Sequence, residues 1–154
     1  MADDRTSTKL GERQLKLRIV NDLAELSRVA ESVEEFLAGL GLAPGCAFKL
    51  NVAIEELLTN TISYGYADSE RHEIAIDISR QGETIVTELS DDARPYDPLN
   101  APPPDLESAI EDRRIGGLGV HLVKTLMDDV AYAYRDGRNH ITLRKNFSAD
   151  SDDA

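Results

Sequence analysis

Two polar residues four positions apart, Glu56 and Asn60, are the first candidates for chemistry in this chain. Residues four apart lie on the same side of a helix, one turn from each other. An amide oxygen is a ligand that Mg²⁺ accepts, and a carboxylate one turn earlier can take a proton from an attacking hydroxyl group or water. The pair can therefore place a metal ion beside a general base. An ordinary surface helix with two polar residues at its margin is the competing interpretation.

A second candidate is Asp91, which follows an alternating strand pattern and opens the segment Asp91 to Pro98. A carboxylate at the end of a strand can accept a hydrogen bond from the exocyclic amine of adenine, whereas guanine carries a carbonyl group at that position. Asp91 therefore predicts adenine recognition. A turn-forming aspartate beside Asp92 is the competing interpretation.

A third candidate is a glycine cluster before a helical pattern, formed by Gly116, Gly117 and Gly119. Glycines let backbone N–H groups approach phosphates, and a following helix N-terminus adds unpaired donors and a favourable dipole. The P-loop pattern is absent. The dinucleotide-binding pattern is not met either, because Leu122 stands where its third glycine belongs. Arg113 and Arg114 precede the cluster and can reach a γ-phosphate when the loop closes. A flexible hinge with solvated arginines is the alternative.

The helix that carries Glu56 and Asn60 is predicted at residues 44–64, because Pro44 fits a first helical turn and Gly65 a helix end. At about 100° per residue its apolar side chains share one broad arc, and Glu56 and Asn60 fall together on one border of that arc. Glu55 falls on the opposite border. The apolar arc comprises Leu50, Ala53, Ile54, Leu57, Leu58, Thr61 and Ile62. We therefore expect Glu56 and Asn60 at the seam between a helix layer and a sheet.

The other periodic patterns predict two further helices, one after Asn21 or Asp22 and one after Gly119. Alternating patterns predict five strands, at residues 14–20, 72–80, 84–89, 130–135 and 139–144. A proline-rich connection at residues 90–115 is typical of a functional lid or a disordered segment. The order of elements predicts an α/β (α+β) two-layer sandwich, with a mixed, mostly antiparallel five-stranded sheet covered on one face by three helices.

The composition limits the classes of function. A chain of 154 residues fits one domain, expected at residues 13–147 between polar, disordered tails at 1–12 and 148–154. The net charge of -12 disfavours nucleic acid and anionic membranes as partners. A bound nucleotide must be held by local donors or a divalent cation, so we expect magnesium dependence if the ligand is a triphosphate. A single cysteine excludes an intrachain disulfide. No signal peptide or long apolar segment is present, so we expect a cytoplasmic protein.

Together the three candidates resemble the N, G1 and G2 boxes of the GHKL superfamily, which has the Bergerat ATP-binding fold. The matching patterns are Glu56-x-x-x-Asn60, Asp91-x-Ala93-x-Pro95 and Gly116-Gly117-Leu118-Gly119. Within that superfamily, the run from Gly117 to Val130 and the closing Asn139 to Leu143 look like the stand-alone anti-sigma factor serine kinases. The resemblance covers residues 14–146.

This resemblance implies a histidine-kinase-like ATP-binding domain with an ATP lid at about residues 92–116. It implies that Asn60 binds Mg²⁺, that Glu56 is the general base, and that Asp91 reads adenine. The remaining nucleotide contacts would come from Ala93, Arg113, Arg114, Gly116, Gly117, Leu118, Gly119 and Val120. It further implies transfer of the γ-phosphoryl group of ATP to a serine or threonine of an anti-sigma-factor antagonist, sequestration of a sigma factor, and a homodimer.

One position departs from the family pattern, because Ala93 stands where the G1 box usually has glycine. The extra methyl group is expected near the adenine. Two other functions stay open. The first is a nucleotide-gated switch that captures a regulator without phosphorylating it, and the second is a detached catalytic domain of a two-component histidine kinase.

Overall fold

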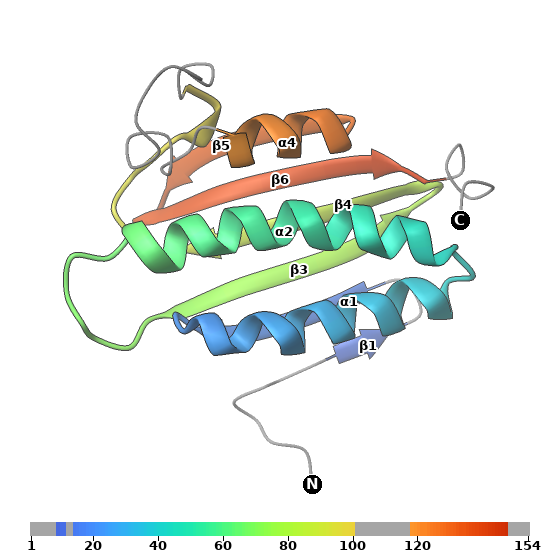
Figure 1. The fold of residues 1–154 in the computed structure, drawn as a ribbon, viewed down its shortest axis with the longest axis horizontal. Helices are drawn as coiled ribbons and strands as arrows, with labels where there is room; N and C mark the ends of the chain where they lie inside the picture. Colours follow the sequence, from blue (N-terminus) through green and yellow to red (C-terminus); the bar gives the residue numbers. More distant parts are fainter. Residues whose placement is uncertain (1–8, 12–13, 101–117, 148–154) are drawn as a thin grey trace, which may run out of the picture.

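The computed structural model describes residues 9–11, 14–100 and 118–147, and within them one six-stranded sheet carries three α-helices on a single face (Figure 1). The strands are β1 (Lys9–Gly11), β2 (Gln14–Val20), β3 (Glu73–Gln81), β4 (Thr84–Asp91), β5 (Asp129–Arg135) and β6 (Arg138–Asn146). The helices are α1 (Leu26–Gly39), α2 (Pro44–Tyr64) and α4 (Leu118–Leu126), together with the 3-10 turns η2 (Leu23–Glu25) and η3 (Pro98–Asn100).

The predicted two-layer architecture is confirmed, with three refinements. The sheet order is β1-β2-β3-β4-β6-β5, and every pairing of neighbouring strands is antiparallel rather than mixed. Strand β1 is an additional edge strand within the segment 1–12 that was expected to be a tail. Strand β4 continues to Asp91, which is therefore the last residue of the strand rather than the first residue after it.

The core lies between the helices and the sheet, because each strand presents alternate side chains to the helix layer. In β3, Ile74, Ile76 and Ile78 are buried while the residues between them are half-buried. The register pairs Ile76 with Leu17 of β2 and with Leu89 of β4, so apolar side chains from three strands lie side by side under α2. A slip of one residue would turn these side chains to the opposite face, which fixes the register.

Helix α2 is central to the helix layer and has the bounds that the sequence predicts. Pro44 occupies its first turn, and Gly65 is its C-cap residue, with its backbone N–H donating to the carbonyl of Thr61. Glu55 is exposed whereas Glu56 is half-buried, which agrees with their opposite positions around the apolar arc. The helix thus directs only one of the two neighbouring glutamates toward the interior.

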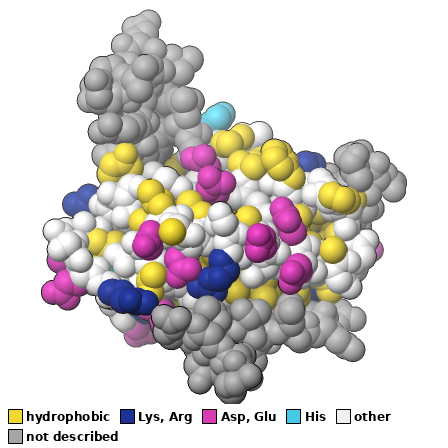
Figure 2. Space-filling model, turned by 60° about the horizontal axis from the view of Figure 1, so that its bottom comes forward, with side chains coloured by type: hydrophobic (Ala, Val, Ile, Leu, Met, Phe, Trp, Pro, Cys, Tyr) yellow, Lys and Arg dark blue, Asp and Glu magenta, His cyan; other side chains and the backbone are white. Residues whose placement is uncertain are grey.

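The outer surface of the helices is acidic. Glu31, Glu34 and Glu35 of α1 and Glu55 of α2 are exposed, and Figure 2 shows acidic side chains spread over this side of the molecule with few lysines and arginines among them. None of the helices that the structure describes is long and apolar enough to span a membrane.

Candidate functional site

A cavity of about 180 Å³ lies between the C-terminal half of α2, the loop that follows β4, and the start of β6. This volume is below that of sites that enclose whole drug-sized ligands, roughly 300 Å³ or more, so it suits one flat ring system rather than a complete nucleotide. Its lining is mainly apolar, with a few polar groups. The lining residues are Leu57, Leu58, Asn60, Thr61, Tyr64, Gly65, Leu89, Asp91, Ala93, Arg94, Pro95, Tyr96, Pro98, Asn139 and Ile141.

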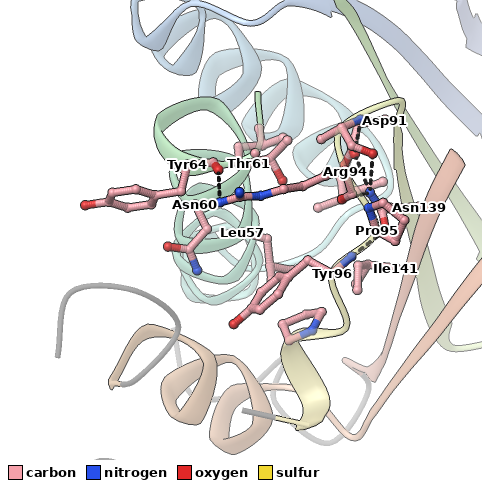
Figure 3. Close-up of a pocket in the computed structure, with 15 residues that line it drawn as sticks. Leu57, Asn60, Thr61, Tyr64, Asp91, Arg94, Pro95, Tyr96, Asn139 and Ile141 are labelled. Atoms are coloured by element: carbon pink, nitrogen blue, oxygen red, sulfur yellow. Dashed lines mark hydrogen bonds between the residues drawn. The ribbon is translucent and has the colours of Figure 1, made fainter. Parts of the chain in front are cut away.

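The cavity brings together residues from both of the first two sequence motifs. Asn60 and Thr61 contribute from α2, and Asp91 and Asn139 lie on the opposite side (Figure 3). Glu56 is not part of the lining itself. It lies one helical turn before Asn60, on the border of the buried face, where residues four apart have their β-carbons roughly 5–6 Å from each other. Glu56 therefore lies on the same side of α2 as the cavity-lining Asn60, one turn earlier and outside the lining itself.

Asp91 is a buried carboxylate with defined partners. Its side chain is 7 % exposed, and Oδ1 accepts hydrogen bonds from the backbone N–H of Ala93 at 3.1 Å and from Nδ2 of Asn139 at 2.9 Å. Burial raises the pKa of the Asp91 carboxyl group, and the hydrogen bonds from Asn139 and Ala93 oppose this rise. Both bonds fix the carboxylate plane at the cavity wall, so its orientation is set before any ligand arrives.

Asn139 also lines the cavity, although the sequence analysis did not predict it as a site residue. It is the second residue of β6, it is 4 % exposed, and it lies directly opposite Asp91 in the β4–β6 register. Its role depends on a pairing between residues 48 positions apart in the chain. The dipeptide Asp136-Gly137 is typical of a tight hairpin turn and so indicates that β5 and β6 are neighbours. No local pattern predicts that β6 pairs with β4.

The loop after β4 is also fastened to the end of α2. The backbone N–H of Arg94 donates to the carbonyl of Gly65 at 3.2 Å, and its guanidinium group donates to the carbonyl of Tyr64 at 2.8 Å. In Figure 3 the Arg94 side chain extends from this loop across to α2. A β-carbon added to Gly65 would lie 2.9 Å from the β-carbon of Ala93, so the methyl group of Ala93 is directed at Gly65. The departure from glycine at position 93 is thereby accommodated at the α2 terminus.

A histidine lies beside this loop, between two carboxylates. Nε2 of His72 is 2.8 Å from Asp68, and Nδ1 is 3.2 Å from Asp92, while the ring stacks on Tyr66 with centroids 4.2 Å apart. The hydrogen bonds to Asp68 and Asp92 raise the pKa of His72. Both ring nitrogens face acceptors, an arrangement that the protonated imidazolium satisfies. His72 thus links the α2–β3 connection to the residue that follows Asp91.

Only part of the glycine motif lies within the described residues. Arg113, Arg114, Gly116 and Gly117 lie outside the described residues. Helix α4 begins at Leu118 and includes Gly119 and the buried Val120, and it packs beside α2. The part of the third candidate that the structure describes therefore belongs to a helix that packs next to the helix carrying Asn60.

The residues that the structure describes contain no group of three His, Cys, Asp or Glu side chains able to hold a metal ion by themselves. Asn60 supplies one neutral oxygen at the cavity. Mg²⁺ commonly takes only one or two protein ligands and completes its coordination with waters and substrate phosphates. The donor set at Asn60 therefore fits a metal ion that arrives together with a triphosphate.

Comparison with known proteins agrees with this geometry. The family described as histidine kinase-like ATPase domain matches residues 19–145, which include α2, β4 and all of β6 except its last residue. The chain belongs to this family. Membership of an ATPase family implies the use of ATP, and the predicted resemblance to the GHKL superfamily is confirmed.

The relatives of this family member include serine kinases. Serine/threonine-protein kinase BtrW of Bordetella bronchiseptica is 28% identical over 104 residues, which cover 68% of this chain and 73% of the relative. Serine-protein kinase RsbW of Listeria monocytogenes is 29% identical over 109 residues, covering 66% and 69%. The predicted resemblance to anti-sigma-factor serine kinases is confirmed by these similarities.

A solved structure has the same fold. The crystal structure of the RsbU and RsbW domains of Rv1364c from Mycobacterium tuberculosis superposes with a TM-score of 0.58 at 16% sequence identity. The match covers 85% of this chain and 32% of that chain. At this identity the likeness shows the fold alone.

Proposed function

We propose that this protein is an ATP- and Mg²⁺-dependent serine/threonine kinase that phosphorylates a regulatory protein. The observation that carries the proposal is that Asn60 and Asp91 line one base-sized cavity, with Glu56 one helical turn before Asn60 on α2. Family membership supplies ATP, and relatives that are named serine kinases supply the class of acceptor.

Each residue has a definite part in this proposal. Asp91 accepts the exocyclic amine of adenine inside the cavity, which sets the direction in which the phosphates leave it. Asn60 binds the Mg²⁺ ion that accompanies the phosphates. Glu56 accepts the proton of the attacking hydroxyl group. Phosphoryl transfer needs little covalent chemistry from the protein, so positioning and charge stabilisation account for most of the catalysis.

The phosphates lie toward the start of α4. Gly116, Gly117, Leu118, Gly119 and Val120 provide backbone donors at the helix N-terminus, and Arg113 and Arg114 neutralise the γ-phosphate. A net charge of -12 makes these local donors and the metal ion necessary for holding a triphosphate. The protein partner is an anti-sigma-factor antagonist that carries the acceptor hydroxyl group, and a sigma factor is the regulator that the kinase sequesters, with a homodimer as the assembly.

The proposal is tested by incubating the protein with γ-labelled ATP, Mg²⁺ and antagonist proteins encoded near its gene. The expected result is label on a serine or threonine of one antagonist, abolished by chelation of Mg²⁺. Changing Asn60 to Ala is expected to weaken Mg-ATP binding by about tenfold or more, because one metal ligand is lost, and calorimetry measures this. Thr59→Ala, one position earlier on α2 and outside the cavity lining, is the matched control.

Two results would contradict the proposal. If Asn60→Ala bound Mg-ATP as tightly as the unchanged protein, Asn60 would not be a metal ligand. If ATP bound but no candidate protein was labelled, the chain would act as a nucleotide-gated binding switch instead.

A further inference from the structure

The side chain of Asn139 is hydrogen-bonded to several residues around the cavity. The two hydrogens of its Nδ2 are shared among three acceptors, Oδ1 of Asp91 at 2.9 Å and the carbonyl oxygens of Ala93 at 3.2 Å and Arg94 at 3.0 Å. Its Oδ1 accepts the backbone N–H of Tyr96 at 3.1 Å and the hydroxyl group of Tyr132. One buried side chain therefore holds four residues of the segment 91–96 and joins them to β5 and β6.

These partners fix the orientation of the Asn139 amide group. The three groups around Nδ2 are acceptors, and a backbone N–H, which can only donate, faces Oδ1. A flipped amide would place an oxygen against three oxygens and an NH₂ group against the Tyr96 N–H. A buried network in which every member is satisfied stiffens its surroundings, whereas a partly satisfied one is costly. The amide thus has one stable placement, and it determines where Asp91 and the following loop lie.

The consequence for ligand binding concerns the second carboxylate oxygen of Asp91. Both bonds that the structure records to this carboxylate, from Asn139 and Ala93, are accepted by Oδ1. The carboxylate is held by that oxygen against β6 and its own loop. Oδ2 is then the oxygen that remains to accept a hydrogen bond from a base in the cavity.

We propose that Asn139 is a positioning residue that determines nucleobase selectivity, because it holds Asp91 and the 93–96 loop in the geometry that recognises a 6-amino purine. This inference rests on the proposed function, in which the cavity receives the adenine of ATP. Asn139 acts through Asp91, and its contribution is to recognition of the amine rather than to the transfer step.

The test compares two nucleotides that differ only in that amine, ATP and purine riboside triphosphate. A hydrogen bond from the amine to a charged acceptor corresponds to roughly 10- to 100-fold in affinity, so the unchanged protein is expected to prefer ATP by about that factor. Asn139→Asp keeps the size of the side chain but replaces its donor by an oxygen facing three acceptors. Its preference is expected to fall to about threefold or less, measured as the ratio of the two dissociation constants by calorimetry.

A variant that only loses stability would not change this ratio. Ile78→Ala removes a fully buried side chain from β3, away from the cavity, and is the matched control, expected to unfold at a lower temperature with the ATP preference intact. Circular dichroism checks that each variant is folded at the temperature of the measurement. Asn139→Ala, which also lacks the donors, is tested in parallel so that the ratio is obtained if Asn139→Asp does not fold.

The outcomes separate this inference from the proposed function. If the folded Asn139 variants kept the full preference for ATP, the inference would be wrong while the kinase assignment stood. An unchanged protein that bound both nucleotides equally would also overturn the inference, since Asp91 would not read the amine. Failure of the unchanged protein to bind ATP at all would overturn the proposed function and the inference with it.

Discussion

Thr87 is a polar side chain on the buried face of β4, between Ile85 and Leu89. It is fully buried, and within the described part of the chain its hydroxyl group has no hydrogen-bond partner. A buried hydroxyl group without a partner is destabilising by about 1–3 kcal/mol relative to a satisfied one, whereas an apolar group of the same shape avoids that cost.

Changing Thr87 to Val is therefore expected to stabilise the fold by about 1 kcal/mol, which raises the melting temperature by roughly 2–4 °C for a domain of this size. Thermal unfolding followed by circular dichroism measures the change. Thr142→Val is the control, because Thr142 is half-buried on β6 and hydration of its hydroxyl group makes its replacement nearly neutral. A lower melting temperature for Thr87→Val would show that this hydroxyl group has a partner after all.

Individual residues also show what sequence reasoning can find at a site. Asn60 and Asp91 follow from residue type and position, because each lies at the border or end of an element whose period is readable. Asn139 and Arg94 do not, since their roles arise from partners brought close only when β6 pairs with β4 and the loop meets α2. The Asp91 motif indicates chemistry, and the side chains that orient it are visible only in the folded chain.

Among the secondary-structure elements, the bounds of α2 can be predicted from local sequence, whereas β1 cannot. Helix α2 has a sustained helical period, a proline at its start and a glycine at its end, so its bounds are predictable. Strand β1 has only three residues and no alternating pattern, and it forms because the edge of β2 offers it a partner. Short edge strands depend on tertiary pairing, which local patterns do not contain.

The junction between α2 and the loop after β4 is close-packed at one glycine. A β-carbon at Gly65 would lie 2.6 Å from the carbonyl oxygen of Thr61 and 2.9 Å from the β-carbon of Ala93. Gly65→Ala must therefore displace the loop or the helix end, and since this loop follows Asp91, we expect nucleotide affinity to fall by about tenfold with a loss of about 1–3 kcal/mol in stability.

The control for this prediction is Gly39→Ala at the end of α1, where a β-carbon meets nothing within 4 Å. That change is expected to leave nucleotide binding unchanged and stability equal or slightly higher, because alanine restricts the unfolded chain. Calorimetry and thermal unfolding measure both variants. Equal behaviour of the two alanine variants would show that the junction is not close-packed.

At the scale of the whole molecule, stability is expected to depend on pH through His72. Its pKa is raised because it donates to Asp68 and Asp92, so its protonated form is more favourable in the folded protein than in the unfolded chain. The stabilisation is therefore complete below the ordinary histidine pKa of about 6.5 and is lost as pH rises through the higher folded value. It also weakens toward about pH 4, where the carboxylates take up protons.

Comparison of the unchanged protein with His72→Gln isolates this contribution. The difference in melting temperature is expected to be largest between about pH 5 and pH 6.5 and to shrink toward pH 9, because glutamine does not titrate. His121→Gln, at an exposed position on α4, is the control and should show no such trend. A difference that grew as the pH rose would contradict the assigned ion pairs.

We propose that the protein transfers a phosphoryl group with Glu56 as the general base, at a cavity that Asn60 and Asp91 help to form. The most direct measurement is the single-turnover rate of phosphate transfer from Mg-ATP to the antagonist protein, for Glu56→Gln beside Glu55→Gln. A general base contributes roughly 10²–10⁴-fold, so Glu56→Gln is expected to slow transfer by at least about 100-fold with the ATP dissociation constant changed by no more than about threefold. Glu55→Gln, one position away on the exposed side of α2, should transfer at the normal rate. An unchanged transfer rate in Glu56→Gln would show that Glu56 is not the general base.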